Sequence, residues 1–177
     1  LIARNYDGLG RNTGFSFGPD YTVAYGFGGD GRFNSVSSSV QSASSVINYS
    51  YLPDSDLLSA ISNMQSGVVS TKSYEDHRNL IIQIKNMAGG NIISQFDYTS
   101  DQLGRRTQRI DTSAVTNTFS YNLKSELVAA SMGTNSYNYW YDNIGNRESA
   151  TNNGETTIYA ANNLNQYTSR TVPGYAD

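Results

Sequence analysis

The 177-residue sequence contains no cysteine, so neither disulfide bonds nor thiolate metal sites can hold the fold together. His77 is the single histidine, and no Gly-x-Ser-x-Gly element or pair of histidines at metal-ligand spacing accompanies it. We therefore expect a protein that is not an enzyme, and we assign no catalytic, metal-binding or cofactor-binding residue.

Charge and long apolar runs are also scarce. Charged residues make up 15% of the chain and the formal net charge is −3, which excludes the diffuse positive field that holds nucleic acids. No apolar run approaches the roughly 20 residues that span a bilayer. We expect no nucleic-acid partner and no membrane insertion by this segment. The chain opens Leu1-Ile2-Ala3-Arg4 without an initiator methionine or signal-peptide pattern, so we expect an internal fragment of a much longer protein.

Aromatic residues are plentiful instead. The sequence has 14 Tyr and 6 Phe among abundant Ser, Thr and Asn, which is a composition typical of β-sheets. The tyrosines head a recurring element, Tyr-Asp-x-x-Gly-Arg, that occurs in recognisable form three times. Its structural anchors are Tyr6, Asp7, Gly10, Arg11, Tyr98, Asp101, Gly104, Arg105, Tyr141, Asp142, Gly145 and Arg147.

Weaker copies of the element fill the intervals between these three. They begin at Tyr25, Tyr51, Tyr74, Tyr121 and Tyr159. Successive tyrosines are separated by between 18 residues (Tyr141 to Tyr159) and 26 residues (Tyr25 to Tyr51), a period typical of repeat arrays. Residues 1–177 are thus expected to form a single run of about eight repeats.

Each interval predicts one β-hairpin, because a stretch of β-formers, a Gly/Asn/Ser-rich break and a second stretch follow one another. The clearest hairpin joins residues 80–85 and 91–98 through the break at residues 86–90, which ends in Gly89-Gly90. Others are expected at residues 127–141 and 148–159. The fold class we predict is all-β, with consecutive antiparallel hairpins forming a curled, twisted ribbon.

Two segments are less regular. Residues 54–66 fit either a hairpin, which keeps the repeat phase, or a helix with an apolar face of Leu57, Leu58, Ile61 and Met64. We favour the hairpin. The serine-rich residues 32–51 have few β-branched side chains, and their long spacing predicts a longer loop.

A candidate ligand face lies in the hairpin at residues 127–141. Tyr137, Tyr139 and Tyr141 are two residues apart and therefore lie on one face of a strand, with Asn138 and Trp140 on the other. Tyrosines of a sheet usually pack across strands, which is the structural interpretation. The alternative interpretation is functional: the three tyrosine rings form a row of aromatic platforms on which sugar rings bind.

The Tyr-Asp-x-x-Gly-Arg elements resemble the RHS/YD-repeat family of bacterial polymorphic toxins, toxin-complex shells, wall-associated proteins and teneurins. The resemblance covers nearly the whole chain. It implies a structural shell or surface segment, secreted or at the cell surface and bacterial, that encapsulates or presents another polypeptide. The partners it implies are the rest of the parent polypeptide and an encapsulated toxin; carbohydrate is the ligand of the alternative function, an adhesion module.

Overall fold

The computed structural model describes residues 1–174, which contain strands and turns but no helix, and therefore no helix that could cross a membrane. The strands are β1 (Ile2–Tyr6), β2 (Asn12–Phe17), β3 (Tyr21–Phe27), β4 (Phe33–Val40), β5 (Ala43–Tyr51), β6 (Leu58–Asn63), β7 (Val68–Tyr74), β8 (Ile81–Ala88), β9 (Asn91–Ser100), β10 (Arg106–Asp111), β11 (Thr116–Tyr121), β12 (Leu127–Met132), β13 (Asn135–Tyr141), β14 (Arg147–Asn152), β15 (Glu155–Ala161) and β16 (Tyr167–Thr171).

The strand order in the 16-stranded sheet follows the sequence from β1 to β16. Neighbouring strands pair antiparallel, as in β2 with β3 and β13 with β14. Each strand therefore pairs with its neighbours in the chain, which is the pattern of consecutive hairpins. The predicted all-β class is confirmed.

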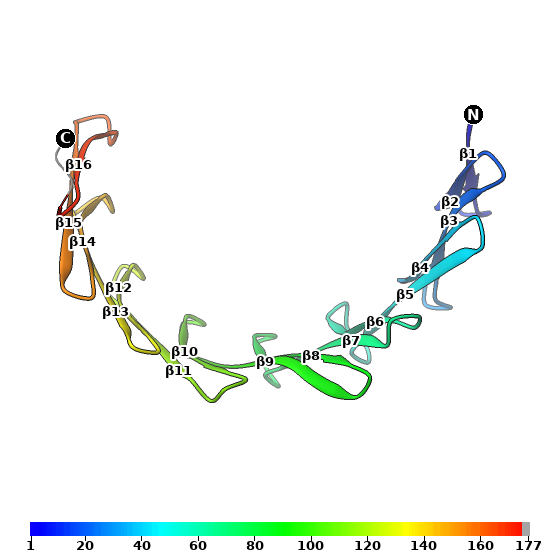
Figure 1. Ribbon diagram of the computed structural model, residues 1–177, viewed down its shortest axis with the longest axis horizontal. Helices are drawn as coiled ribbons and strands as arrows, with labels where there is room; N and C mark the ends of the chain where they lie inside the picture. The colour runs from blue at the N-terminus through cyan, green and yellow to red at the C-terminus, as the bar shows by residue number, and fades with distance from the viewer. Residues whose placement is uncertain (175–177) are drawn as a thin grey trace. The chain divides into compact units, whose positions relative to one another are not determined.

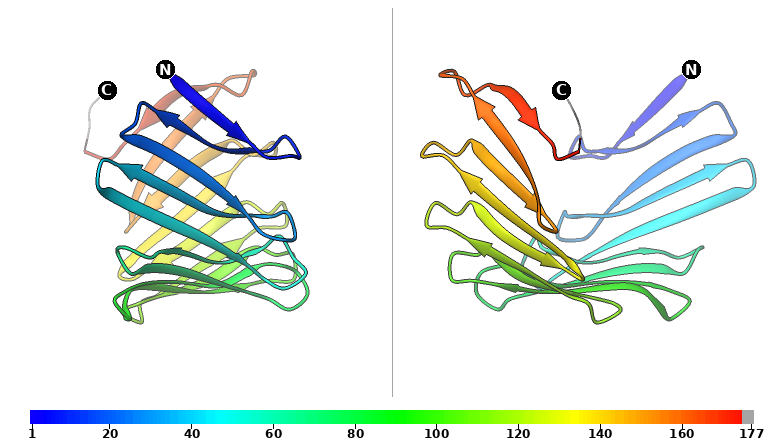
Figure 2. Two further views of the ribbon diagram at one scale, coloured as in Figure 1. Left: turned by 90° about the vertical axis from the view of Figure 1, so that its right-hand side faces the viewer. Right: turned by 60° about the vertical axis from the view of Figure 1, so that its left-hand side comes forward.

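The chain divides into two units, Leu1–Gln95 and Phe96–Asp177, with the boundary inside β9. Within each unit the hairpins lie side by side in a single layer, and successive strands rotate relative to one another (Figures 1 and 2). Such rotation follows from the right-handed twist of β-strands. Taken by itself, each unit is a twisted ribbon.

A single layer has two faces and leaves little to bury. Among the described residues, Val23 and Ala130 are the buried hydrophobic side chains, and Asn117, 2% exposed, is the buried polar one. Most tyrosines are half-buried against neighbouring strands instead. The ribbon is therefore held by its hydrogen-bond ladder and by cross-strand side-chain pairs more than by a core.

The structure shows how the two less regular segments, residues 54–66 and 32–51, fold. Residues 58–63 form β6, which pairs antiparallel with β7, so the favoured hairpin is confirmed over a helix. The longer loop expected in residues 32–51 is wrong: β4 and β5 are long strands joined by Gln41-Ser42, and small serines fit a two-faced sheet. The expected five-residue break at 86–90 shrinks to Gly89-Gly90, whose φ angles of 55° and 83° permit a two-residue turn.

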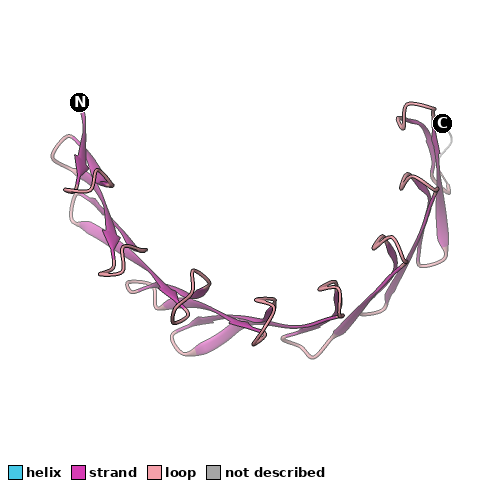
Figure 3. Cartoon of the chain, turned by 180° about the vertical axis from the view of Figure 1, so that it is seen from behind, coloured by secondary structure: helices cyan, strands magenta, loops and turns pink. Residues whose placement is uncertain are grey.

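Two kinds of connection alternate along the chain. Tight turns close the hairpins at one edge of each unit, and hooked loops, which we call corners, join one hairpin to the next at the other edge (Figure 3). A β-bulge interrupts the pairing of the two strands that a corner joins, for example between Trp140 and Tyr141 in the β13–β14 pair. A bulge bends a strand and resets its register. The recurring tyrosine element lies at these corners.

Candidate functional site

The corner at residues 7–11 shows why the element needs its residue types. Asp7 Oδ1 accepts hydrogen bonds from the backbone N–H groups of Leu9 and Arg11, both at 2.9 Å. Asp7 Oδ2 accepts a third from Arg11 Nε at 2.7 Å. Gly10 adopts a φ of 78°, a backbone conformation that residues other than glycine rarely adopt. Aspartate, glycine and arginine together close the loop.

Other corners keep this geometry with different chemistry. Asp101 and Arg105 repeat the same bonds, with Arg105 Nε 2.7 Å from Asp101 Oδ2. Where the first residue is Asn122, the fifth is Glu126, whose Oε2 accepts from the asparagine Nδ2 at 2.6 Å. The corners beginning at Asp142 and Asn162 end in Asn146 and Gln166, again a donor facing an acceptor. In these five corners the first and fifth residues remain complementary even where their identities change.

Corner side chains also reach forward to the next corner. Arg11 Nη1 donates to the carbonyl oxygen of Gly31 at 3.1 Å, and Arg32 donates to that of Ser55. In the second unit the links are Arg105 Nη1 to Asn122 O (3.1 Å), Lys124 Nζ to Asn143 O (2.6 Å) and Asn146 Nδ2 to Asn165 Oδ1 (3.4 Å). The fifth residue, or Lys124 in its place, thus ties one hairpin to its successor.

The tyrosine at the strand end reaches backward. Its hydroxyl donates to the carbonyl oxygen of the first residue of the strand that left the preceding corner. The pairs are Tyr51 to Phe33 (2.6 Å), Tyr74 to Leu58 (2.8 Å), Tyr121 to Arg106 (2.8 Å) and Tyr141 to Leu127 (3.0 Å). The repeat element therefore contains a backward link, a loop closure and a forward link.

The structure places the predicted anchors at these corners with local offsets. Tyr6 and Tyr141 end their strands, whereas Tyr98 lies two residues before the end of β9, where Ser100 stands. Likewise, Tyr25 and Tyr159 precede strand ends occupied by Phe27 and Ala161.

Arg147 does not occupy the loop-closing position that Arg11 and Arg105 hold in their corners. In the corners that begin at Asp7 and Asp101 the loop-closing residue lies four positions after the aspartate, and in this copy that residue is Asn146. Arg147 instead begins β14, with its guanidinium carbon 4.6 Å from the centre of the Tyr139 ring. Its Nε is buried and makes no hydrogen bond among the described residues.

The corner aspartates are electrostatically stabilised as carboxylates. A hydrogen bond from the Arg11 side chain lowers the pKa of Asp7 below its ordinary 3.8, with backbone N–H donors adding to the effect. Backbone and side-chain hydrogen bonds from Arg32 lower the pKa of Asp30 in the same way. The corners are thus built for pH values at which these groups are charged.

A polar cluster that sequence reasoning missed lies at the β10–β11 hairpin. The Asn117 side chain donates to Asp111 Oδ2 at 3.1 Å, and Arg109 Nε donates to Asp111 Oδ1 at 2.6 Å. The hydrogen bond from Arg109 lowers the pKa of Asp111. No pattern in the sequence marks Asn117, because its burial depends on the pairing of β11 with β10 and β12.

The tyrosines of the candidate ligand face make contacts within the protein itself. Tyr137, Tyr139 and Tyr141 are half-buried, Tyr141 donates its hydroxyl to Leu127, and Arg147 stacks on Tyr139. The strongly exposed aromatic ring of β13 is Trp140, at 52%. It belongs to the opposite face.

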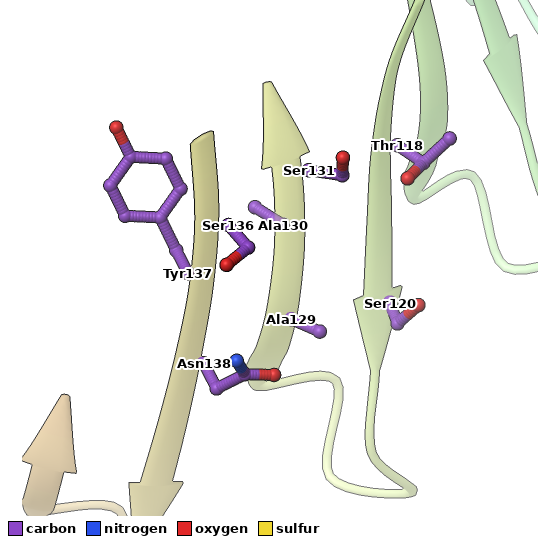
Figure 4. Close-up of a pocket in the computed structure, with 8 residues that line it drawn as sticks. All are labelled: Thr118, Ser120, Ala129, Ala130, Ser131, Ser136, Tyr137 and Asn138. Atoms are coloured by element: carbon purple, nitrogen blue, oxygen red, sulfur yellow. The ribbon is translucent and has the colours of Figure 1, made fainter. Parts of the chain in front are cut away.

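A shallow hollow of about 200 Å³ lies on that opposite face, between β11, β12 and β13. Small side chains form it, with hydroxyl groups from Ser120, Ser131 and Ser136 and the amide of Asn138. In Figure 4 the Tyr137 ring points to the other side of β13 from Ser136 and Asn138. Within residues 1–174, no group of three His, Asp or Glu side chains could hold a metal ion.

Comparison with known proteins extends the fold assignment. No family model and no curated protein matches the chain. Crystal structures of TcdB2-TccC3-Cdc42 and of TcdB2-TccC3 without its hypervariable C-terminal region each align with 94% of this chain at a TM-score of 0.81. The chain has the fold of an RHS/YD-repeat ribbon. Sequence identity to these structures is 15%, and the chain spans 10% of their length.

Proposed function

We propose that the chain is a structural segment of an RHS/YD-repeat shell or surface layer that encapsulates or presents another polypeptide. Its setting in this proposal is a secreted or cell-surface bacterial protein concerned with toxin delivery or surface display. The observation that carries the proposal is the corner, which links hairpins backward through its tyrosine and forward through its fifth residue or Lys124. The likeness in fold to the TcdB2-TccC3 complexes supports it.

A single-layered sheet of this kind is suited to forming the wall of a shell. A ribbon one sheet thick, with buried hydrophobic side chains only at Val23 and Ala130 among the described residues, leaves both faces accessible. Corner contacts between neighbouring hairpins allow such a wall to extend without a central core, as in other repeat proteins. One face can then meet solvent while the other meets a partner polypeptide.

Protease protection tests this function. The purified gene product that contains the chain is treated with proteinase K under native conditions and again after acid has opened the corners. A polypeptide segment that survives only under native conditions supports encapsulation. Digestion of every segment outside the ribbon at the same rate in both states contradicts it. Cell fractionation of the producing organism tests the secreted or surface location.

Carbohydrate binding is the second candidate, and Trp140 favours it. The ring lies opposite Ser149, which in turn lies opposite Ile158, and Asn138 stands two residues away on the same face. An exposed indole beside uncharged hydroxyl and amide groups suits the apolar face and the hydroxyls of a sugar ring.

A glycan array separates this candidate from the wall function. Trp140→Ala is expected to abolish any glycan signal, whereas Tyr137→Ala, on the other face of β13, leaves it in place. Loss with Tyr137→Ala alone would move the site to the tyrosine face. An array without signal for the unmodified chain removes carbohydrate as a ligand.

A further inference from the structure

We propose that a hollow between the corners at residues 52–57 and 75–80 binds a free α-amino acid with an aliphatic side chain. Both corners lie in the first unit, one before and one after the β6–β7 hairpin. The inference concerns a small-molecule site on the ribbon and does not depend on the proposed function.

These two corners are built differently from the corner at residues 7–11. In the first of them the backbone bond that closes the loop runs from the Leu52 N–H group to the Leu57 carbonyl oxygen, at 2.9 Å. In the second it runs from Glu75 to Leu80, also at 2.9 Å. Each of these bonds spans five positions, whereas the corresponding bond at residues 7–11 spans four. Both corners are therefore one residue longer.

The longer corner at residues 52–57 also lacks the usual chemistry. Leu52 and Leu57 hold the positions that Asp7 and Arg11 hold in their corner, so no polar pair can close the loop. Neither leucine side chain can donate a forward hydrogen bond to the next corner. A place where a structure departs from its own local rule is expected to be functional or strained. A bound molecule is thus a candidate for the contact that side chains make elsewhere.

An open hollow of about 490 Å³ lies between the two corners. This volume is within the range of about 300–1,000 Å³ that is typical of small-molecule sites. Leu52, Pro53 and Leu57 of the first corner line it, together with Tyr74 from the end of β7. These side chains offer apolar surface that an aliphatic side chain of a ligand can cover.

Two groups of opposite charge line the same hollow. Within residues 1–174, neither the Lys72 ammonium group nor the Asp76 carboxylate makes a hydrogen bond or an ion pair, and the two do not pair with each other. Glu75 is neutralised inside its own corner, because its two carboxylate oxygens accept hydrogen bonds from Arg78 at 2.7 and 2.9 Å. One cation and one anion are therefore left for a ligand.

A free α-amino acid carries the matching groups on one carbon atom. Its carboxylate can accept a hydrogen bond from Lys72 and its ammonium group can donate one to Asp76, and such charge-assisted bonds are the strong ones. Its side chain then lies on the apolar surface of Leu52 and Leu57. An internal peptide segment lacks both charges, and each end of a peptide has only one. For a ligand of this size in an open site we expect a Kd of about 0.1–1 mM.

Equilibrium dialysis with radiolabelled L-leucine tests the site. The purified gene product that contains the chain should bind L-leucine, and Lys72→Gln or Asp76→Asn should each weaken binding at least tenfold. The matched controls are Lys85→Gln and Asp20→Asn, which remove the same charges elsewhere in the first unit and should leave binding unchanged. Circular dichroism confirms that each variant keeps its strands. No binding by the unmodified protein, or equal binding by all four variants, overturns the proposal.

Leucine derivatives that lack one charge test the ligand class, and they remain informative if a variant misfolds. N-acetyl-L-leucine keeps the carboxylate and L-leucinamide keeps the ammonium group. Each should displace the labelled leucine at least tenfold more weakly than unlabelled L-leucine does. Glycine keeps both charges but has no side chain, and it should also compete more weakly. A derivative that competes as well as L-leucine contradicts the pairing of both charges.

Discussion

The backward link of the corner tyrosine predicts a measurable loss of stability when the hydroxyl is removed. In Tyr74→Phe the ring stays and only the bond to the Leu58 carbonyl oxygen, 2.8 Å long, disappears. A hydrogen bond of this kind contributes about 0.5–1.5 kcal/mol net, and a fully buried orphan acceptor would cost about 1–3 kcal/mol. Tyr74 also lines an open hollow beside Leu52 and Lys72, so its side chain is not sealed from water. We expect a loss of about 0.5–1 kcal/mol.

Urea denaturation followed by circular dichroism measures this difference. The matched control is Tyr137→Phe, which removes the hydroxyl of a half-buried tyrosine that does not end its strand. The midpoint should fall for Tyr74→Phe with the slope unchanged, and should barely move for the control. Equal effects of the two substitutions would refute the backward link, and a loss above about 3 kcal/mol would show that the ring itself had moved.

The Tyr74 hydroxyl adds a dependence on pH. Burial raises the pKa of Tyr74 above 10.0, so the folded chain holds this proton more tightly than the unfolded chain. The resulting stability is fully present below pH 10.0 and is lost as the pH rises through the higher folded value. The stability difference between the unmodified chain and Tyr74→Phe should therefore shrink in strongly alkaline solution. A difference that stays constant up to pH 12 contradicts this linkage.

Three further predictions concern the corners and the buried asparagine. Because the pKa of Asp7 is lowered on folding, its contribution to the free energy of unfolding is present above pH 3.8 and is lost as the pH falls through the lower folded value. The Asp7→Asn substitution should remove this acid-sensitive step from an NMR titration of the Arg11 amide. Gly10→Ala, at φ 78°, should destabilise the β1–β2 pair by about 1–2 kcal/mol in hydrogen exchange, whereas Gly8→Ala, which meets no atom within 4 Å and has no positive φ, should not. Asn117→Ala should cost about 1–3 kcal/mol in urea denaturation, because it removes a buried donor, and a smaller loss than at an exposed asparagine would contradict its role.

The sequence is sufficient to predict the hairpins, because their signals are local. A two-residue alternation of side chains and a turn such as Gly89-Gly90 lie within one short window. The loop closure by Asp7 and Arg11 is equally local, since the two residues are four positions apart. The Asp101 and Arg105 pair follows the same rule.

The links between hairpins are not local, and the sequence does not predict them. The tyrosine hydroxyls reach carbonyl oxygens from 14 to 18 residues away, and the exact partner depends on the bulge that resets the register. The same dependence explains why Tyr98 lies two residues before its strand end. Composition favours tyrosine as the anchor, whereas the ladder of β9 and β10 decides where the strand stops.

The two-way corner explains how a chain with 15% identity to the TcdB2-TccC3 structures keeps their fold. The closing pair can be Asp with Arg or Asn with Glu, because only a donor facing an acceptor is required. Most forward and backward links end on backbone carbonyl groups, as in Arg11 to Gly31, so the accepting residue is free to vary; the link from Asn146 to the Asn165 side chain is an exception. A ribbon joined mainly through backbone acceptors can lose most of its sequence similarity while each hairpin still fits its neighbours. Its stability should accordingly be a sum of hairpin and neighbour terms, so that one broken corner loosens two hairpins and leaves distant ones intact.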